Sequence, residues 1–242
     1  MVNKPLSGSQ KCSATLEMKE ALDSIRNEDK RAYLKALSLP EGFLETELDP
    51  LLFLHFEDFD GKAAADRLTS YWETRAEIFG HRAFLPINDL TGQGALNETD
   101  LLCFKSGICV QLPNDAAGQP VICSDPTLLD PSLRSSAKTS RLRVLMCCLH
   151  KFCKKYPLKK NCTNNFGVAS LRIIEENNWD RSGVHADYII LENVMPVCFS
   201  AVRVLCVPSQ KARRAFQDTI FPILQGRLHK IFGTRGIMHQ GE

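Results

Sequence analysis

Residues 194–208 read VMPVCFSAVRVLCVP, a Met-Pro step followed by a nearly all-apolar run and a closing proline. The run from Val202 to Val207 is short and carries a single charge, which is typical of a strand buried on both sides. Pro208 has no backbone N–H and is expected to end that strand. In the next segment, residues 209–232, apolar side chains recur at every fourth position and predict an amphipathic helix. A sheet that is covered on one face by such a helix can hide a hydrophobic molecule from water.

Three further stretches of the second half are typical of strands. Residues 108–125, ICVQLPNDAAGQPVICSD, predict a hairpin that turns at residues 114–118. Strands are also expected at 167–174 and, as an edge strand, at 236–240. Helices are expected from Ser135 or Ser136 to about Tyr156 and, with a weaker pattern, at 183–193. Strands that alternate with helices predict an α/β fold with an open sheet flanked by helices.

The first half is typical of an all-helical module. Asp49, with Pro50 at the first helical position, is expected to start a short helix. Asp60 is expected to cap a longer helix from Gly61 to Phe79, which Gly80 ends. The other helices are expected at 14–37, 41–48 and 97–105. The predicted division is a disordered N-terminus at 1–13, a helical module at 14–95 and an α/β domain at 96–242.

The composition is that of an ordinary globular chain, with 44% hydrophobic and 24% charged residues in 242. The N-terminus lacks the apolar core of a signal peptide, and no apolar run is long enough to span a bilayer, so a cytoplasmic location is expected. The ten cysteines are therefore expected to be reduced thiols that pack as small hydrophobic residues. Their spacing matches no common zinc site, so neither a metal nor another cofactor is expected.

The charge is unevenly distributed along the chain. Residues 1–130 hold 12 Lys+Arg and 21 Asp+Glu, whereas residues 131–242 hold 18 and 7. One interpretation is attraction of the second half to an anionic membrane surface or nucleic acid. The other is that the acidic half folds against the basic half, so that the two fields partly cancel.

Taken in order and spacing, these motifs resemble the CRAL-TRIO family of lipid-binding proteins. The resemblance extends over about residues 40–240. The motifs of its helical part are Asp49-x-Leu51-Leu52, Phe59-Asp60 and Tyr71-Trp72-x-x-Arg75. The motifs of its sheet part are the Gly-Gln-Pro-Val run at 118–121, Gly167-Val168, Met195-Pro196, the strand that ends at Pro208, and Phe216 to Leu224.

The resemblance implies a non-enzymatic, monomeric protein that holds one hydrophobic ligand, such as a phospholipid or an isoprenoid, and exchanges it at membranes. In the family, the helix after the proline-ended strand closes over the cavity, and this assigns the lid to residues 209–232. Pro222 is expected to kink this lid, which favours movement. Peripheral membrane contact is expected through five basic residues of the lid, Lys211, Arg213, Arg214, Arg227 and Lys230.

Side chains alternate between the two faces of a strand, and this alternation predicts which of them line the cavity. The predicted strand set is Val110, Val121, Cys123, Leu171, Ile173, Val204 and Cys206, with Leu145 and Leu149 as the floor and Phe216, Ile220 and Leu224 as the lid. Ordinary core packing is the alternative explanation for each of these positions.

Two departures from the family pattern limit what the resemblance implies. In the phosphatidylinositol-binding branch a Glu-Arg pair follows the Met-Pro motif, whereas Val197 and Cys198 stand here. That headgroup specificity is therefore not expected. Family members usually add another strand and helix, so a C-terminally shortened domain is expected.

Three other functional hypotheses compete with ligand transfer. A CRAL-TRIO scaffold also serves as a protein-interaction or regulatory module, which remains the main alternative. A thiol enzyme built on Cys147, Cys148 and His150 is not expected, because neighbouring residues of a helix point in different directions and no acid lies nearby. Nucleic-acid binding is not expected either, because it rests on the basic stretch alone.

Overall fold

The computed structural model describes residues 8–116, 118–129, 138–156, 168–175, 193–207, 222, 225–226, 229 and 236–240. These residues form a mixture of helices and strands, which confirms the predicted α/β class. The chain divides into two compact units. The helical unit comprises Met1–Leu96, Leu149–Asn161 and Tyr188–Val197, and the sheet unit comprises Asn97–Cys148, Cys162–Asp187 and Cys198–Glu242.

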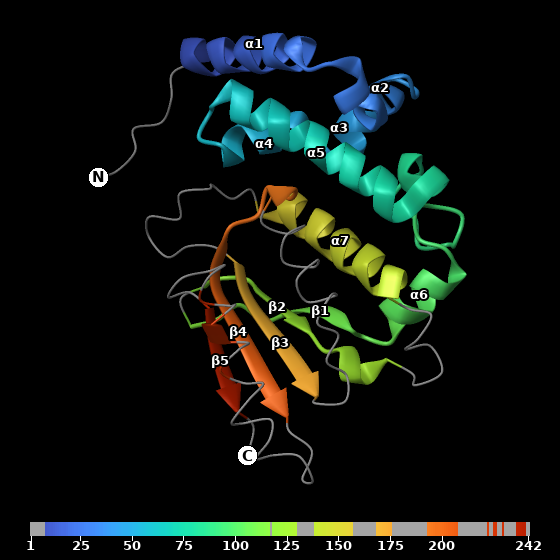
Figure 1. Ribbon diagram of the computed structural model, residues 1–242, viewed down its shortest axis with the longest axis vertical. Helices are drawn as coiled ribbons and strands as arrows, with labels where there is room; N and C mark the ends of the chain where they lie inside the picture. Colours follow the sequence, from blue (N-terminus) through green and yellow to red (C-terminus); the bar gives the residue numbers. More distant parts are fainter. Residues whose placement is uncertain are drawn as a thin grey trace. The chain divides into compact units, whose positions relative to one another are not determined.

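Several helices packed around the longest of them make up most of the helical unit (Figure 1). Their bounds are α1 Gly8–Ser24, η1 Asn27–Asp29, α2 Arg31–Leu37, α3 Phe43–Leu48, α4 Pro50–Phe56, α5 Gly61–Phe79 and η2 Gly80–Phe84. The long helix, α5, packs against α1, α2 and α4. Helix α7, Lys138–Lys155, is divided between the units, because its residues from Leu149 onward belong to the helical unit.

Helix α5 begins and ends as the sequence predicts. The Asp60 carboxylate accepts a hydrogen bond of 2.9 Å from the backbone N–H of Ala63, which satisfies one of the free donors at the helix start. Gly80 ends the helix with φ of 60°, in the region that favours glycine. The predicted apolar stripe, which includes Leu68 and Trp72, is buried. The cap at Asp49 and Pro50 is confirmed in the same way for α4.

Two predictions about the N-terminal region were wrong. Helix α1 begins at Gly8, so residues 8–13 are helical where disorder was expected. No proline or glycine interrupts residues 9–13, and the helix therefore extends toward the N-terminus. The single helix expected at 14–37 is instead interrupted after Ser24, because Arg26 has an extended backbone (ψ of 141°) and residues 27–29 form a 3₁₀ turn.

The start of α5 lies very close to α1. A Cβ atom placed on Gly61 would be 2.6 Å from the backbone nitrogen of Met18 and 2.9 Å from the carbonyl carbon of Glu17. Real side chains do not approach a backbone this closely, so only glycine fits here without a shift of α1. This contact sets the distance between the two helices.

The sheet unit holds one five-stranded sheet, in the order β1-β2-β3-β4-β5 (Figure 1). Its elements are α6 Glu98–Lys105, β1 Cys109–Leu112, β2 Val121–Ser124, η3 Pro126–Leu128, the first part of α7, β3 Val168–Glu175, β4 Phe199–Val207 and β5 Gly236–Gln240. Strands β1 and β2 are antiparallel, which confirms the predicted hairpin, and the other neighbours are parallel. Parallel neighbours need a crossover connection, and α7 lies in the connection from β2 to β3.

Strand β4 differs from its prediction. It begins at Phe199, three residues before the expected Val202, and it is fully buried on one side only. Val202 and Val204 are buried, whereas the alternate residues Arg203 and Leu205 are half-buried. The apolar run gave no sign of this difference, because both of its faces are almost free of polar residues.

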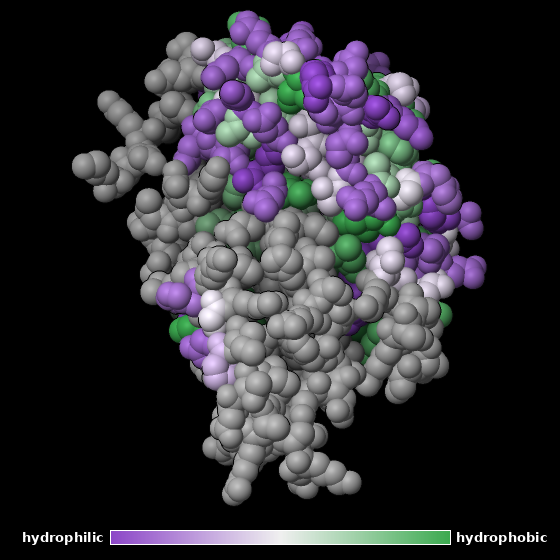
Figure 2. Space-filling view, in the orientation of Figure 1, coloured by the Kyte–Doolittle hydropathy of each residue, from purple (hydrophilic) through white to green (hydrophobic). Residues whose placement is uncertain are grey.

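Several expected features lie outside the described residues or are only partly described. The edge strand at 236–240 is confirmed, whereas the helix expected at 183–193 falls outside. Within the lid segment, Pro222, Gln225, Gly226 and His229 are helical and exposed. None of the helices in the described part of the chain is both long enough and apolar enough to cross a membrane. Figure 2 shows hydrophilic side chains over most of the visible surface of the helical unit.

Candidate functional site

The strand register divides the sheet side chains into two faces. Val110 pairs with Cys123, Cys123 with Leu171, Leu171 with Arg203, and Arg203 with Ile237, so this row crosses all five strands. Paired residues of neighbouring strands share a face. The side chains of this face that the structure describes are Val110, Leu112, Val121, Cys123, Ile173, Ala201, Arg203, Leu205 and Ile237, and we call it the open face.

Helix α7 packs against part of the other side of the sheet, and we call this side the covered face. Cys109, Ile122, Val202 and Val204 belong to it, and all four are buried. The Cys148 thiol of α7 lies 3.7 Å from the carbonyl oxygen of Cys109, which places the first part of α7 against this face (Figure 1).

The side chains of the open face are more exposed to solvent than the four described above for the covered face. Val110 keeps 40% and Ile237 keeps 36% of the side-chain surface exposed, and the residues between them are mostly half-buried. Cys123 is the exception, since it is buried. The face therefore presents apolar side chains that the described residues do not fully enclose.

The predicted cavity residues do not all belong together. Val110, Val121, Cys123 and Ile173 share the open face, and the backbone of Leu171 pairs in the same row as Val110. Val204 lies on the covered face, and the backbone of Cys206 pairs with Ile174 in the register of that face. The prediction that all strand residues of the set share one face was therefore wrong. A shift of one residue exchanges the two faces of a strand, and the apolar run of β4 does not indicate which alternate set points inward.

The predicted floor is also corrected. Leu145 is half-buried in the sheet unit, whereas Leu149 is buried and belongs to the helical unit. The most buried residues of α7 include Val144, Met146, Cys147, Leu149 and His150, which together extend over more than one side of the helix. A stripe of leucines predicted one inner face, but a helix that is shared between two units is buried on more than one.

Arg203 is a feature of the open face that the sequence analysis did not assign. It is half-buried and stands in the same cross-strand row as Val110 and Cys123. Its guanidinium is a charged group in a row whose other residues are apolar, and guanidinium groups donate hydrogen bonds to anionic or polar groups. The signal in the sequence was a lone arginine inside an otherwise apolar strand.

Three thiols lie where α7 meets the hairpin, Cys109, Cys147 and Cys148, and Cys123 on the opposite face is close enough to act on Cys109 electrostatically. A hydrogen bond with Cys148, together with burial, raises the pKa of the Cys109 thiol well above its ordinary value. Burial likewise raises the pKa of Cys123. Both thiols are therefore protonated at neutral pH and are poor nucleophiles. No group of three or more His, Cys, Asp or Glu residues among those described is arranged to hold a metal ion.

The expectation that all cysteines are reduced holds for seven of them and fails for one. The free thiols are Cys12, Cys103, Cys109, Cys123, Cys147, Cys148 and Cys153. Cys198 is disulfide-bonded. The sequence held no Cys-x-x-Cys pair or other spacing that marks such a bond, and the side chains of Cys162 and Cys206 are outside the described set.

A buried polar network crosses the helical unit. Arg75 is fully buried and donates from Nη2 to the Glu47 carboxylate at 2.7 Å and to the Leu85 carbonyl at 2.8 Å. Its Nη1 donates to the Tyr71 hydroxyl at 3.2 Å, and that hydroxyl lies 3.1 Å from Nδ1 of His150. Tyr71 accepts from Arg75, so its O–H is free to donate to Nδ1.

This network keeps His150 neutral. Burial, reinforced by the positive charge of Arg75, lowers the pKa of His150 well below its ordinary value. Nδ1 accepts from Tyr71, so the proton of the neutral ring is on Nε2. His150 therefore serves the packing of the helical unit and is not paired with the neighbouring thiols of α7 as a catalytic base.

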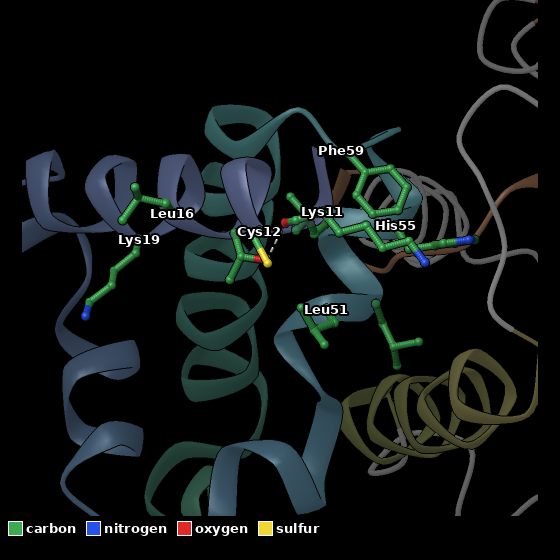
Figure 3. A pocket seen from close by; sticks show the side chains of 10 residues that line it. Lys11, Cys12, Leu16, Lys19, Leu51, His55 and Phe59 are labelled. Carbon is green, nitrogen blue, oxygen red and sulfur yellow. Dashed lines mark hydrogen bonds between the residues drawn. The ribbon is translucent and has the colours of Figure 1, made fainter. Parts of the chain in front are cut away.

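The helical unit also contains a pocket, lined by one side of α1 and one side of α4 (Figure 3). Its volume is about 660 Å³, and its lining is almost entirely apolar. Helix α1 contributes Lys11, Cys12, Thr15, Leu16 and Lys19, and the α4 region contributes Leu51, Leu52, Leu54, His55 and Phe59. The sequence analysis did not predict this pocket, because each helix alone shows only a few exposed leucines.

Comparison with known proteins gives no further assignment. A scan against protein-family models found no match, and neither did a search of the curated proteins.

The predicted lid residues Phe216, Ile220 and Leu224 lie outside the described residues, as do the five basic residues expected at the membrane, Lys211, Arg213, Arg214, Arg227 and Lys230.

Proposed function

We propose that the chain binds one hydrophobic ligand, a phospholipid, isoprenoid or similar molecule, on the open face of its sheet and exchanges it at membrane surfaces. The observation that carries this proposal is the row from Val110 to Ile237, an apolar surface across five strands that keeps about a third or more of both end residues exposed. Sheets with parallel strands normally have both faces covered. A hydrophobic ligand under a helical lid would supply the missing cover.

The proposal includes a CRAL-TRIO-like arrangement. Several helices precede a hairpin that leads into parallel strands, and a helix covers one face, as in the pattern that the sequence resembles. In this arrangement residues 209–232 form the lid, and Phe216, Ile220 and Leu224 meet the ligand. The basic residues of the same segment would face anionic headgroups during exchange.

The energetics suit a carrier. Each CH₂ group of a ligand that leaves water for an apolar site contributes roughly 0.8 kcal/mol, so a long chain is held firmly against water. A bilayer offers similar surroundings, and transfer between protein and membrane is therefore close to balanced.

Transfer of a fluorescent lipid from donor to acceptor vesicles tests this proposal. We expect the chain to speed transfer and Val110→Asp to reduce the rate at least several-fold, because a carboxylate on the open face opposes an apolar ligand. Gln111→Asp is the matched control, since Gln111 is exposed on the same strand and belongs to the other face. Equal transfer by both variants would contradict a ligand site on the open face.

A protein-interaction module without ligand transfer is the second candidate, because an exposed apolar face also suits a protein partner. The same assay separates the two. A chain that never takes up lipid from vesicles, yet loses binding of a partner protein in Val110→Asp, would support the second candidate.

A further inference from the structure

The pocket between α1 and α4 has the properties of a binding site that is separate from the open face. Its volume of about 660 Å³ is within the range of roughly 300–1,000 Å³ that small-molecule sites occupy. Leu54 is buried at its base, whereas Leu16 and Leu51 at its sides keep 57% and 53% of their surfaces exposed. These exposed leucines are apolar surface that a bound hydrocarbon chain would remove from water.

The charged side chains of the pocket are of one sign. Lys11 and Lys19 are eight residues apart on α1, so they lie on one side of the helix, about 12 Å apart along its axis. None of the described residues that line the pocket is acidic. An apolar groove with an ammonium group toward each end matches a chain that carries a negative charge.

His55 adds a polar group inside this groove. Its Nδ1 atom is buried and has no hydrogen-bond partner among the described residues, and such an atom costs free energy until it finds one. The ring is held edge-on to Phe59, with ring centroids 5.8 Å apart. Phe59 itself has a positive φ of 67°, a strained conformation for an aromatic residue, which fixes its ring beside the pocket. The Thr15 hydroxyl is not an unpartnered polar group of this kind, because it donates a hydrogen bond to the Lys11 carbonyl at 2.9 Å.

We propose that this groove binds a single-chain anionic amphiphile of the fatty-acid type. The hydrocarbon chain lies along Leu16, Leu51 and Leu54. The carboxylate meets the ammonium group of Lys11 and the imidazole of His55, which lie at the same end of the groove (Figure 3). The concave shape favours a chain inside the groove over the flat surface of a bilayer. This site is in the helical unit and does not depend on the ligand proposed for the sheet.

Laurate, used below its micelle concentration, tests the proposal by calorimetry on the full chain. We expect laurate to bind saturably in the groove. Dodecylammonium, which has the same chain and the opposite charge, should bind at least tenfold more weakly. Leu51→Glu and Lys11→Glu should each weaken laurate binding at least tenfold. The matched controls are Leu37→Glu, a leucine 49% exposed in the same unit, and Lys62→Glu, an exposed lysine of α5.

Cys12 supplies a second readout that needs no substitution. It is an exposed free thiol that lines the groove, so bound laurate should slow its alkylation by N-ethylmaleimide several-fold. Alkylation of Cys148, a half-buried thiol of the sheet unit, should keep its rate. Equal affinity for laurate and dodecylammonium would overturn the proposal, as would laurate binding that survives Leu51→Glu and is lost in Val110→Asp. Binding to phosphatidylserine vesicles without saturable laurate binding would also overturn it and assign this surface to membranes.

Discussion

The two units close their interiors in opposite ways. In the helical unit, a network of charged and polar side chains is buried: Arg75 and Glu47 form an ion pair that water does not reach, and Tyr71 connects it to His150. In the sheet unit, one face is packed against α7 while the opposite face keeps apolar side chains such as Val110 partly exposed. A substitution in a network of paired buried groups usually destabilises the fold. A partly exposed apolar face tolerates substitutions better and leaves room for a ligand. Substitutions in the buried network of the helical unit should therefore damage stability, and those on the open face should mainly affect binding.

The largest effect is expected from Arg75→Met. It leaves the Glu47 carboxylate buried without its charge partner, and breaking such a pair typically costs about 3–5 kcal/mol of unfolding free energy. Urea titration followed by circular dichroism measures the loss. Arg26→Met is the control, because Arg26 pairs with Glu28 and Asp29 on the surface and should lose less than about 1 kcal/mol. Similar losses for both variants would show that the buried network does not hold the helical unit together.

Gly61→Ala tests the contact between α5 and α1. Alanine ordinarily stabilises a helix by about 1 kcal/mol relative to glycine. Here its Cβ would meet the Met18 backbone at 2.6 Å, and overpacking of this kind typically costs about 1–3 kcal/mol. Gly226→Ala is the control, because no atom lies within 4 Å of its added Cβ, and its urea midpoint should stay or rise. A Gly61→Ala variant more stable than the parent would contradict the close approach.

The two faces of the sheet can be compared with one conservative change. Val204→Thr places a hydroxyl on the covered face and should cost about 1–3 kcal/mol of unfolding free energy, because the buried hydroxyl loses its water. Val110→Thr makes the same change on the open face and should stay within about 0.5 kcal/mol. Urea midpoints of the two variants measure the difference. If the order were reversed, the assignment of the faces would be wrong.

The smallest effect is a pH dependence that comes from His150. Because the pKa of His150 in the folded chain is below its ordinary value, the unfolded chain binds more protons once the pH falls below about 6.5. Stability should therefore fall with decreasing pH, by at most about 1.4 kcal/mol per pH unit from this group. Urea midpoints at pH 7.5 and 5.5 should differ less in His150→Gln than in the parent, whereas exposed His81→Gln should leave the difference as it is. An unchanged difference in His150→Gln would remove His150 as its source.

Local signals in the sequence predicted most of the elements. Asp49, Asp60 and Gly80 mark helix ends by hydrogen bonds and backbone angles that involve near neighbours, and these three positions are as predicted. The edge strand at 236–240 also matches. Such features depend on a few consecutive residues, which a sequence displays directly.

What the sequence did not predict depends on contacts between distant segments. Val204 and Val110 are on opposite faces because of the strand register, which no single strand determines. The ion pair of Glu47 and Arg75 joins residues 28 positions apart. The pocket of α1 and α4 likewise exists only when the two helices lie side by side. The shared face of Val110, Val121 and Cys123 follows from the hairpin, which fixes its own register, whereas the faces of residues beyond the hairpin depend on pairing between distant strands.

The most direct test of the proposed ligand site is mass spectrometry of organic extracts from the purified chain, compared with Val110→Asp and Gln111→Asp. We expect one kind of hydrophobic molecule near one per chain in the parent and in Gln111→Asp, and a clear loss in Val110→Asp. No hydrophobic molecule in any extract, together with no uptake from vesicles, would contradict a ligand on the open face.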